Sequence, residues 1–404
     1  MESGDDVLGA AADQILRSGL KGLTLRSLAQ SVGISPSLLS YRYGSRENLI
    51  LAVFEQAISA REENFAGLAS QLHGVASRPD QLPSLALGVA GVTTGPQADI
   101  ALIGWVGQAV SQRIPGLAEI MANWPASACS FWAERFDEMG IERQLAYAFS
   151  AGFEVAVRIG LLAGSDARIK IWMTDVILRL CERITRCPVS SPGDSAARQQ
   201  LAAAGLNQAA AAPEPRTGTA ERIIEAACAL ILSHGPDALS HRLIASETGI
   251  SLSSMTHHFR SIDEIMMRAF DRIYERARRE TSDRVPDVNT IDELCSTVLP
   301  AILERASMRG SENTAMDEII LAASRSPDAA SYSGALLAMT GRTSTLMLRS
   351  IDSVGERADR LDGQVFRFIL TGLSEQAASM PAEDRAIWLT EQCGCFLHAC
   401  WDRQ

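Results

Sequence analysis

The chain contains two copies of one sequence segment, placed 216 positions apart. The first copy runs from Val7 to Phe54 and the second from Ile223 to Phe270, and the two align without a gap. Matched residues include Ala10 with Ala226, Gly19 with Gly235, Arg26 with Arg242, Gly33-Ile34-Ser35 with Gly249-Ile250-Ser251, and Ser45 with Ser261. Because each copy must build the same supersecondary unit, this repeat constrains the architecture more than any other feature.

The repeat continues beyond these segments. Ile171-Trp172 matches Ile387-Trp388 at the same offset, and Ala151-Gly152 matches Thr371-Gly372 after a short insertion. We therefore predict two full-length homologous halves. The predicted segments are a first head at 1–55, a first helical body at 56–187, a linker at 188–217, a second head at 218–272 and a second helical body at 273–404.

Composition favours an all-α protein. Hydrophobic residues make up 47% of the chain and charged residues 21%, and apolar positions recur at a spacing of three to four. The net charge of −11 argues against a general nucleic-acid coat, but it allows sequence-specific DNA binding through a local basic face. We expect a cytoplasmic protein without a membrane segment, because the acidic start lacks an apolar signal core. The eight cysteines lack metal-finger spacing, so no metal and no cofactor is predicted.

The predicted linker has prolines near both ends. Pro188 and Pro192 open it, Pro213 and Pro215 close it, and an Ala-rich stretch lies between them. Prolines stop helices, so the two halves are expected to be separated here. The Ala-rich stretch from Ser195 to Ala211 is compatible with a helix or with a loose chain.

Each head is predicted to be a helix-turn-helix unit. In the first head we expect helices at Asp6–Ser18, Leu25–Ser31 and Pro36–Tyr43, with a tight turn at Gly33. Thr24, Ser35 and Ser45 are predicted N-caps, and in the second head Ser261 and Glu264 form a predicted capping box.

These motifs resemble the TetR family of transcriptional regulators. The resemblance is carried by Thr24-Leu25-Arg26-Ser27-Leu28-Ala29, Val32-Gly33-Ile34-Ser35 and Ser40-Tyr41-Arg42-Tyr43-Gly44-Ser45, and in the second copy by Ser240-His241-Arg242, Thr248-Gly249-Ile250-Ser251 and His257-His258-Phe259-Arg260-Ser261. It covers about 50 residues of each half. It implies a DNA-binding head followed by a variable helical region for effector binding and dimerisation.

In a helix-turn-helix protein the second helix enters the major groove of double-stranded DNA. Leu39 and Tyr43 are expected to face the core of the head, which leaves the other residues of that helix for DNA. Arg26 and Arg46 are placed for phosphates, although both could also be ordinary solvated charges. The predicted DNA-contacting residues are Arg26, Ser35, Ser37, Leu38, Ser40, Tyr41, Arg42, Ser45 and Arg46 in the first head, and Arg242, Ser251, Ser253, Ser254, Thr256, His257, His258, Arg260 and Ser261 in the second.

The two heads differ in charge and in detail. Over residues 6–50 there are five basic and three acidic residues, whereas over 222–266 there are three basic and five acidic residues. Because phosphate neutralisation supplies much of the affinity for DNA, the first head is predicted to bind more tightly. Ser40 and Thr256 stand where the family usually has a tyrosine, and Ile262 replaces Arg46 in the second copy. The His257-His258 pair suits neutral hydrogen bonding or a pH-sensitive phosphate contact rather than a metal.

The family dimerises through its last two long helices. Carried onto this chain, these are residues 141–163 with 167–186, and 355–379 with 382–401. We therefore expect the halves to form one four-helix bundle within a single chain, as a pseudo-dimer that recognises an imperfectly palindromic operator. Further dimerisation of the chain stays open.

The resemblance also implies a small-molecule effector that releases a repressor from DNA. The candidate effector residues are aromatic side chains of the first body, which favour an apolar or aromatic compound: Trp105, Trp124, Phe131, Trp132, Phe149 and Phe153. Core packing is the alternative role for each of them.

Other readings follow from single features. Cys181, Cys187, Cys393, Cys395 and Cys400 lie on or beside the terminal helices, which allows a thiol redox switch as well as plain packing. A second alternative is a protein in which only the first head binds DNA. Asp317-Glu318 is interpreted as a pair of helix-surface acids, and because no catalytic motif is found, an enzyme is not predicted.

Overall fold

All regular structure in the described part of the chain is helical, as the apolar spacing predicts. In the computed structural model the described residues are 4–162, 166–189, 193–210, 218–282, 288–301, 310–325, 337–338 and 340–402. The predicted linker residues 190–192 and 211–217 lie outside them. Within these ranges no helix is both long enough and apolar enough to span a bilayer.

The first half contains a head and a body that share one long helix. Its elements are α1 (Gly4–Gly22), α2 (Leu25–Ser31), α3 (Pro36–Tyr43), α4 (Arg46–Leu72), η1 (Pro79–Gln81), α5 (Leu82–Thr93), α6 (Ala98–Val110), α7 (Leu117–Met121), α8 (Ala126–Met139), α9 (Leu145–Leu161) and α10 (Ala167–Thr185). Since α4 crosses the predicted boundary at residues 55 and 56, the head is rigidly continuous with its body.

The rest of the chain begins with the linker helix α11 and continues with a second helix-turn-helix head and a second helical body. Its described elements are α11 (Ala196–Ala210), α12 (Thr219–His234), η2 (Pro236–Ala238), α13 (His241–Thr248), α14 (Leu252–His258), α15 (Ile262–Ser282), α16 (Ile291–Glu293), η3 (Leu294–Val298), α18 (Gly310–Arg325), α20 (Arg342–Ser350), η4 (Gly355–Arg357), α21 (Arg360–Gln376) and α22 (Ala382–Trp401). The helix α15 likewise crosses the predicted boundary between residues 272 and 273.

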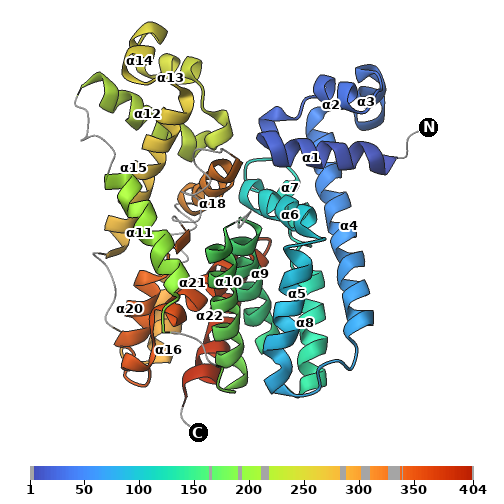
Figure 1. The fold of residues 1–404 in the computed structure, drawn as a ribbon, viewed down its shortest axis with the longest axis vertical. Helices are drawn as coiled ribbons and strands as arrows, with labels where there is room; N and C mark the ends of the chain where they lie inside the picture. The colour runs from blue at the N-terminus through green and yellow to red at the C-terminus, as the bar shows by residue number, and fades with distance from the viewer. Residues whose placement is uncertain are drawn as a thin grey trace.

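Four helices from the two halves pack against one another in the lower body of the molecule (Figure 1). They are α9, α10, α21 and α22, which correspond to the helices expected to form the bundle. The matched glycines of the repeat lie where α9 and α21 cross. A Cβ atom on Gly372 would lie 2.4 Å from the carbonyl oxygen of Ala151, and one on Gly152 would lie 2.9 Å from Ile369. The crossing is therefore too close for any larger side chain at Gly372.

Ion pairs connect the same helices across the halves. The guanidinium of Arg158 on α9 binds both carboxylate oxygens of Glu375 on α21, and the distance from Nη1 to Oε1 is 2.7 Å. On α10, Arg183 binds Asp362 at 2.7 Å between Nε and Oδ1. Arg158 and Asp362 are buried. Buried pairs of this kind add little net stability, but each partner needs the other, so they fix one register between the halves.

The Ala-rich stretch of the predicted linker is helical and docked. Its helix α11 packs on α10. Arg198 is buried, binds Asp194 at 2.6 Å through Nε and donates to the carbonyl oxygen of Ala338 at 2.8 Å. Leu201 is also buried. The first part of the linker therefore belongs to the fold, and the loose alternative is wrong for residues 196–203.

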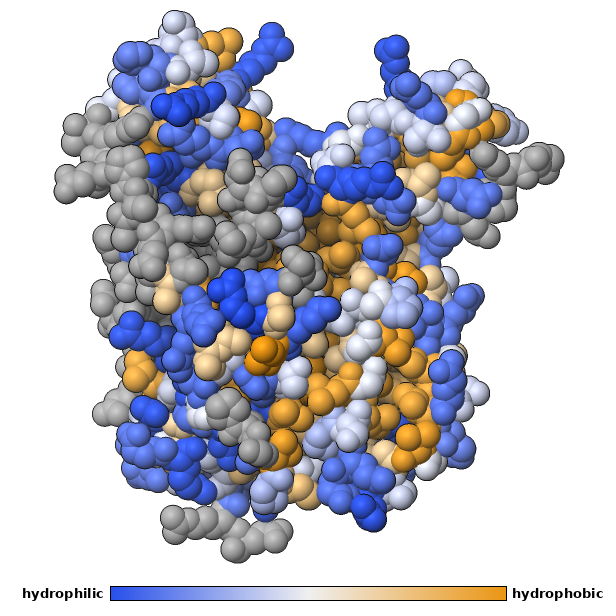
Figure 2. All heavy atoms as spheres, in the orientation of Figure 1, coloured by the Kyte–Doolittle hydropathy of each residue, from blue (hydrophilic) through white to orange (hydrophobic). Residues whose placement is uncertain are grey.

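Both heads lie at the same end of the molecule. Figure 1 shows α2 and α3 beside α13 and α14 at the top, with the bundle below them. Figure 2 shows a notch between the two heads, and the upper part of each carries a mixture of hydrophilic, intermediate and hydrophobic residues. The helices α3 and α14 therefore lie at the same end of the molecule, above one shared base.

Candidate nucleic-acid interface

The first head has the turn and caps that its sequence predicts. The helix α1 is broken at Gly19, which has φ of 68°. Thr24 caps α2 by accepting from the amide of Ser27 at 3.0 Å, and Gly33 makes the turn with φ of 70°. Ser35 accepts from the amide of Leu38 at 3.2 Å and begins α3. The local sequence thus determines where α3 starts and how it leaves the turn.

One face of α3 anchors it and the opposite face is solvated. Leu39 is completely buried, and Tyr43 is half-buried against the core. Tyr41 is 89% exposed and Leu38 is 50% exposed. The exposed residues among those predicted to contact DNA from this head are Arg26, Ser35, Ser37, Leu38, Ser40, Tyr41 and Arg42, and Ser45 is half-buried. An exposed tyrosine and leucine on a groove-sized helix offer apolar contact to base edges.

Arg46 has an internal role that the sequence analysis did not expect. Its Nε donates to the carbonyl oxygen of Leu23 at 2.6 Å, and its Nη2 donates to the carbonyl oxygen of Leu20. Leu20 lies in the last turn of α1 and Leu23 just after it, and the carbonyls at a helix end have few helical donors. The guanidinium assigned to phosphate is therefore used to close the end of α1, and Arg42 and Arg26 are left as the exposed cations among the predicted contacts.

The second head is built in the same way with different residues. Ser240 caps α13, Gly249 makes the turn with φ of 68°, and Ser251 caps α14 by accepting from the amide of Ser254 at 3.1 Å. Met255 and Phe259 are buried where the first head has Leu39 and Tyr43. The repeat therefore preserves the anchoring positions of the recognition helix while it changes their side chains.

The predicted capping box at Ser261 is only half formed. The Ser261 hydroxyl accepts from the amide of Glu264 at 3.1 Å. The carboxylate of Glu264 accepts from the amide of Arg260 at 2.8 Å, which is one residue before the cap. The start of α15 is therefore capped on both sides, but the second hydrogen bond reaches one residue farther back than in the predicted capping box.

The solvated face of α14 carries hydroxyl and imidazole groups. Arg242, Ser251, Ser253, Thr256, His257, Arg260 and Ser261 are exposed, and Ser254 and His258 are half-buried. The rings of His257 and His258 are 5.4 Å apart and nearly perpendicular. Leu252 is 53% exposed at the first position of α14, and the sequence analysis missed it because it looked only for polar contacts there.

All six aromatic residues proposed for the effector are buried, and four of them, Phe131, Trp132, Phe149 and Phe153, pack on one another. Trp132 packs edge to face on Phe149 at 4.7 Å and on Phe153 at 5.0 Å between ring centroids, and on Phe131 at 5.0 Å. All six, Trp105, Trp124, Phe131, Trp132, Phe149 and Phe153, are at most 5% exposed. In this conformation they form a packed core, so packing accounts for them without a ligand.

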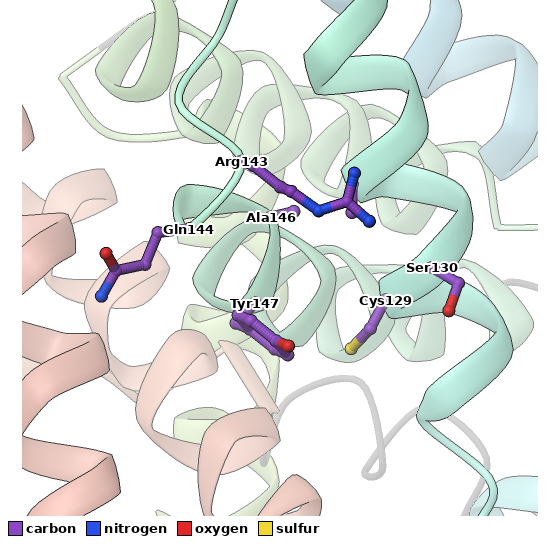
Figure 3. A pocket seen from close by; sticks show the side chains of 7 residues that line it. Cys129, Ser130, Arg143, Gln144, Ala146 and Tyr147 are labelled. Carbon is purple, nitrogen blue, oxygen red and sulfur yellow. The ribbon is translucent and has the colours of Figure 1, made fainter.

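A cavity of about 380 Å³ opens beside this core, between α8 and the start of α9. Figure 3 shows the thiol of Cys129 and the hydroxyl of Tyr147 pointing toward one another, with the Arg143 side chain extending toward α8. The lining residues are Cys129, Ser130, Ala133, Arg143, Gln144, Ala146 and Tyr147. The Tyr147 ring also contacts Trp388 of α22, with centroids 5.9 Å apart. The cavity wall is therefore part of the contact between the halves.

Two buried features correct further expectations. Glu318 is buried rather than on a helix surface, and burial raises its pKa to about 7. Burial likewise raises the pKa of its neighbour Asp317 to about 6. The eight cysteines are free thiols, and burial raises the pKa of Cys181, Cys393 and Cys400. A raised pKa lowers the thiolate fraction, which weakens the redox interpretation.

Comparison with known proteins identifies the second head. Residues 223–269 match the family model described as bacterial regulatory proteins, tetR family. This range contains α13, the glycine turn and α14. No protein of curated function matches the chain. The match supports a DNA-binding transcriptional regulator of the TetR family, with a helix-turn-helix head at residues 223–269.

Proposed function

We propose that one copy of this chain binds a double-stranded DNA operator with both heads and acts as a ligand-released repressor. The main support is the placement of α3 and α14 at one end of a body to which each half contributes two bundle helices (Figure 1). Single-headed relatives need two chains to present two recognition helices about one duplex turn, or 34–36 Å, apart. Here the bundle that would join two chains joins two halves.

The operator should be an imperfect palindrome, because the two recognition helices differ. Tyr41 and Arg42 on α3 correspond to His257 and His258 on α14. An arginine can donate two hydrogen bonds to one guanine, whereas a histidine offers fewer donors and a different reach. Each half-site should therefore have its own preferred bases.

Selection from a random duplex library followed by footprinting tests this proposal. We expect protection of two unequal half-sites about one helical turn apart by a single 43.5 kDa chain. Protection of one half-site would favour the alternative in which only one head binds, which the acidic surplus of the second head supports. A complex containing two chains on one operator would contradict the single-chain version.

Matched variants distinguish the heads. Arg42→Ala should weaken binding more than Arg260→Ala, because the first head has the basic surplus. The measurement is a gel-shift titration at two salt concentrations. Greater loss from Arg260→Ala would refute the predicted asymmetry.

For the effector we propose the cavity beside α8 rather than the packed aromatic cluster. Its lining combines Arg143, an aromatic wall at Tyr147 and small residues at Ala133 and Ala146, which suits a small aromatic carboxylate. Arg143 is paired with Asp137, so the ligand's carboxylate would have to take the place of that residue. A compound there would press on the Tyr147–Trp388 contact and so favour one arrangement of the halves.

Ala133→Trp should fill the cavity from α8 without touching either head. We expect it to abolish release from DNA by a panel of aromatic carboxylates such as benzoate and salicylate, while DNA affinity without ligand stays unchanged. If the panel releases the variant as well as the wild type, the cavity is not the effector site.

A further inference from the structure

The two heads meet through the ends of their first helices. The matched glycines Gly19 and Gly235 end the regular parts of α1 and α12, and both have positive φ. A Cβ on Gly19 would lie 2.2 Å from Oδ2 of Asp237, and a Cβ on Gly235 would lie 2.3 Å from Oε2 of Glu318. Each glycine therefore allows a carboxylate to approach the backbone at the junction.

Arg113 from the first half completes this junction. It lies in the loop after α6, yet its Nη1 donates to the carbonyl oxygen of Ser233 at 2.8 Å and its Nη2 to that of Leu232 at 3.2 Å. Its Nε binds Glu318 on α18. A single guanidinium thus bridges the first body, the end of α12 and the second body.

The bonds made by Arg113 satisfy a need that the second head does not meet itself. The last carbonyls of a helix have no helical donors, and a cation is favourable there. In the first head Arg46 donates to the carbonyl oxygen of Leu20 in the last turn of α1 and to that of Leu23 just after it, but the corresponding residue of the second head is Ile262. At the end of α12 a cation from the first half, Arg113, donates to a different pair of carbonyls, those of Leu232 and Ser233.

The helix α12 is also the support of the second recognition helix. It packs on α13, α14 and α15, so a displacement of α12 carries α14 with it. The α12 end in turn is held against α18 through Glu318 and through Asp237, which pairs with Arg325 at 2.7 Å. The position of α14 relative to the first half consequently depends on the Arg113 contacts.

We propose that Arg113 is a positioning residue that fixes the separation of α3 and α14 by holding the end of α12 from the opposite half. The inference rests on the proposed function in one respect, namely that both helices contact one duplex. Removing Arg113 should leave each head folded and able to bind a half-site, but it should let the second head shift relative to the first.

A spacing series of operators tests this directly. The selected operator is rebuilt with its half-sites moved apart or together by one or two base pairs. The full-length wild type should prefer one spacing by about tenfold or more in Kd. Because Arg113→Ala alone would leave Glu318 buried without its partner, the decisive variant is Arg113→Ala with Glu318→Gln. This variant should lose the spacing preference and keep the wild-type affinity for a single half-site.

Arg113→Lys and Arg78→Ala serve as controls. Lysine retains the charge but cannot reach three acceptors in a planar arrangement, so a weakened preference is expected. Arg78 is an exposed arginine paired with Asp80 on η1, remote from the junction, and its loss should change nothing.

A second measurement needs no DNA. Spin labels on genetically encoded ketone residues replacing the exposed Ser37 and Ser253 report the distance between α3 and α14 by pulsed electron resonance. The distribution should be narrow in the wild type and broad in the Arg113→Ala, Glu318→Gln variant. A narrow distribution together with an unchanged spacing preference in that variant would overturn the inference. If instead the wild type selects no duplex or shows no spacing preference, the two-headed function fails, and the label distances still decide the role of Arg113.

Discussion

Glu318 is predicted to destabilise the folded protein at pH 8, although its ion pair with Arg113 suggests that it stabilises it. The carboxylate binds Arg113, and only 8% of its side chain is exposed. Burial opposes ionisation more strongly than Arg113 favours it, so the pKa in the folded protein is raised from 4.5 to about 7. At about 1.4 kcal/mol for each pKa unit, ionised Glu318 costs the folded state about 3 kcal/mol at pH 8.

The pH window follows from the two pKa values. An acid with a raised pKa binds its proton more tightly in the folded state, so folding is favoured below the unfolded value of 4.5 and loses this advantage as pH rises to about 7. Glutamine keeps an oxygen that can accept from Arg113 and cannot ionise. Glu318→Gln should therefore be more stable than the wild type by up to about 3 kcal/mol at pH 8, with little difference at pH 4.

Urea unfolding monitored by circular dichroism at several pH values between 4 and 8 measures this difference. Glu62→Gln removes an exposed acid on α4 and should follow the wild type throughout. If Glu318→Gln is less stable than the wild type at pH 8, and the deficit shrinks on acidification, the ion pair outweighs burial and the reasoning is wrong.

Three further predictions concern other parts of the molecule. Gly372→Ala should destabilise the protein by about 1–3 kcal/mol, because its Cβ would overlap the Ala151 backbone, whereas Gly67→Ala at an open position of α4 should stabilise it by about 0.5–1 kcal/mol. Urea unfolding midpoints measure both changes, and equal midpoints would contradict the close crossing of α9 and α21. Arg46→Ala should lower the stability of the first head by about 1–3 kcal/mol, while Arg42→Ala should reduce DNA affinity without changing stability. Calorimetry measures the stability and gel shifts measure the affinity; the reverse pattern would mean that Arg46 contacts a DNA phosphate. Iodoacetamide at pH 8 should leave Cys181 and Cys393 unmodified in the native protein, since burial raises the pKa of both thiols, and rapid alkylation detected by mass spectrometry would reopen the redox alternative.

Local signals were sufficient for the heads and for the bundle helices. Caps at Ser35 and Ser251 and left-handed glycines at Gly33 and Gly249 determine backbone geometry over a few residues, so the sequence alone predicts the turn and the helix starts. The repeat then predicts that the same elements recur and aligns Gly152 with Gly372, and the structure places both glycines where α9 and α21 cross.

Contacts between residues that are far apart in the sequence could not be predicted from the sequence. Arg46 and Arg113 both look like solvated cations, but each donates to backbone carbonyls that lie 23 and more than 100 residues away along the chain. The aromatic residues were assigned to a ligand because composition shows how many rings there are and not whether the rings fill one another's space. Glu318 was placed on a surface for the same reason, since its burial depends on α12 and Arg113 rather than on its own helix.

The differences between the two heads explain why a single chain can do what two identical chains cannot. In a symmetric dimer both heads must close their first helices by the same means, because each substitution appears twice. Here Arg46 of the first head donates to the carbonyls of Leu20 and Leu23. The second head carries Ile262 at that position, and Arg113 of the first half donates instead to the carbonyls of Leu232 and Ser233. The Arg113 contacts require the second half to stay beside the first, and a covalent connection, with its α11 segment docked on α10, favours that arrangement.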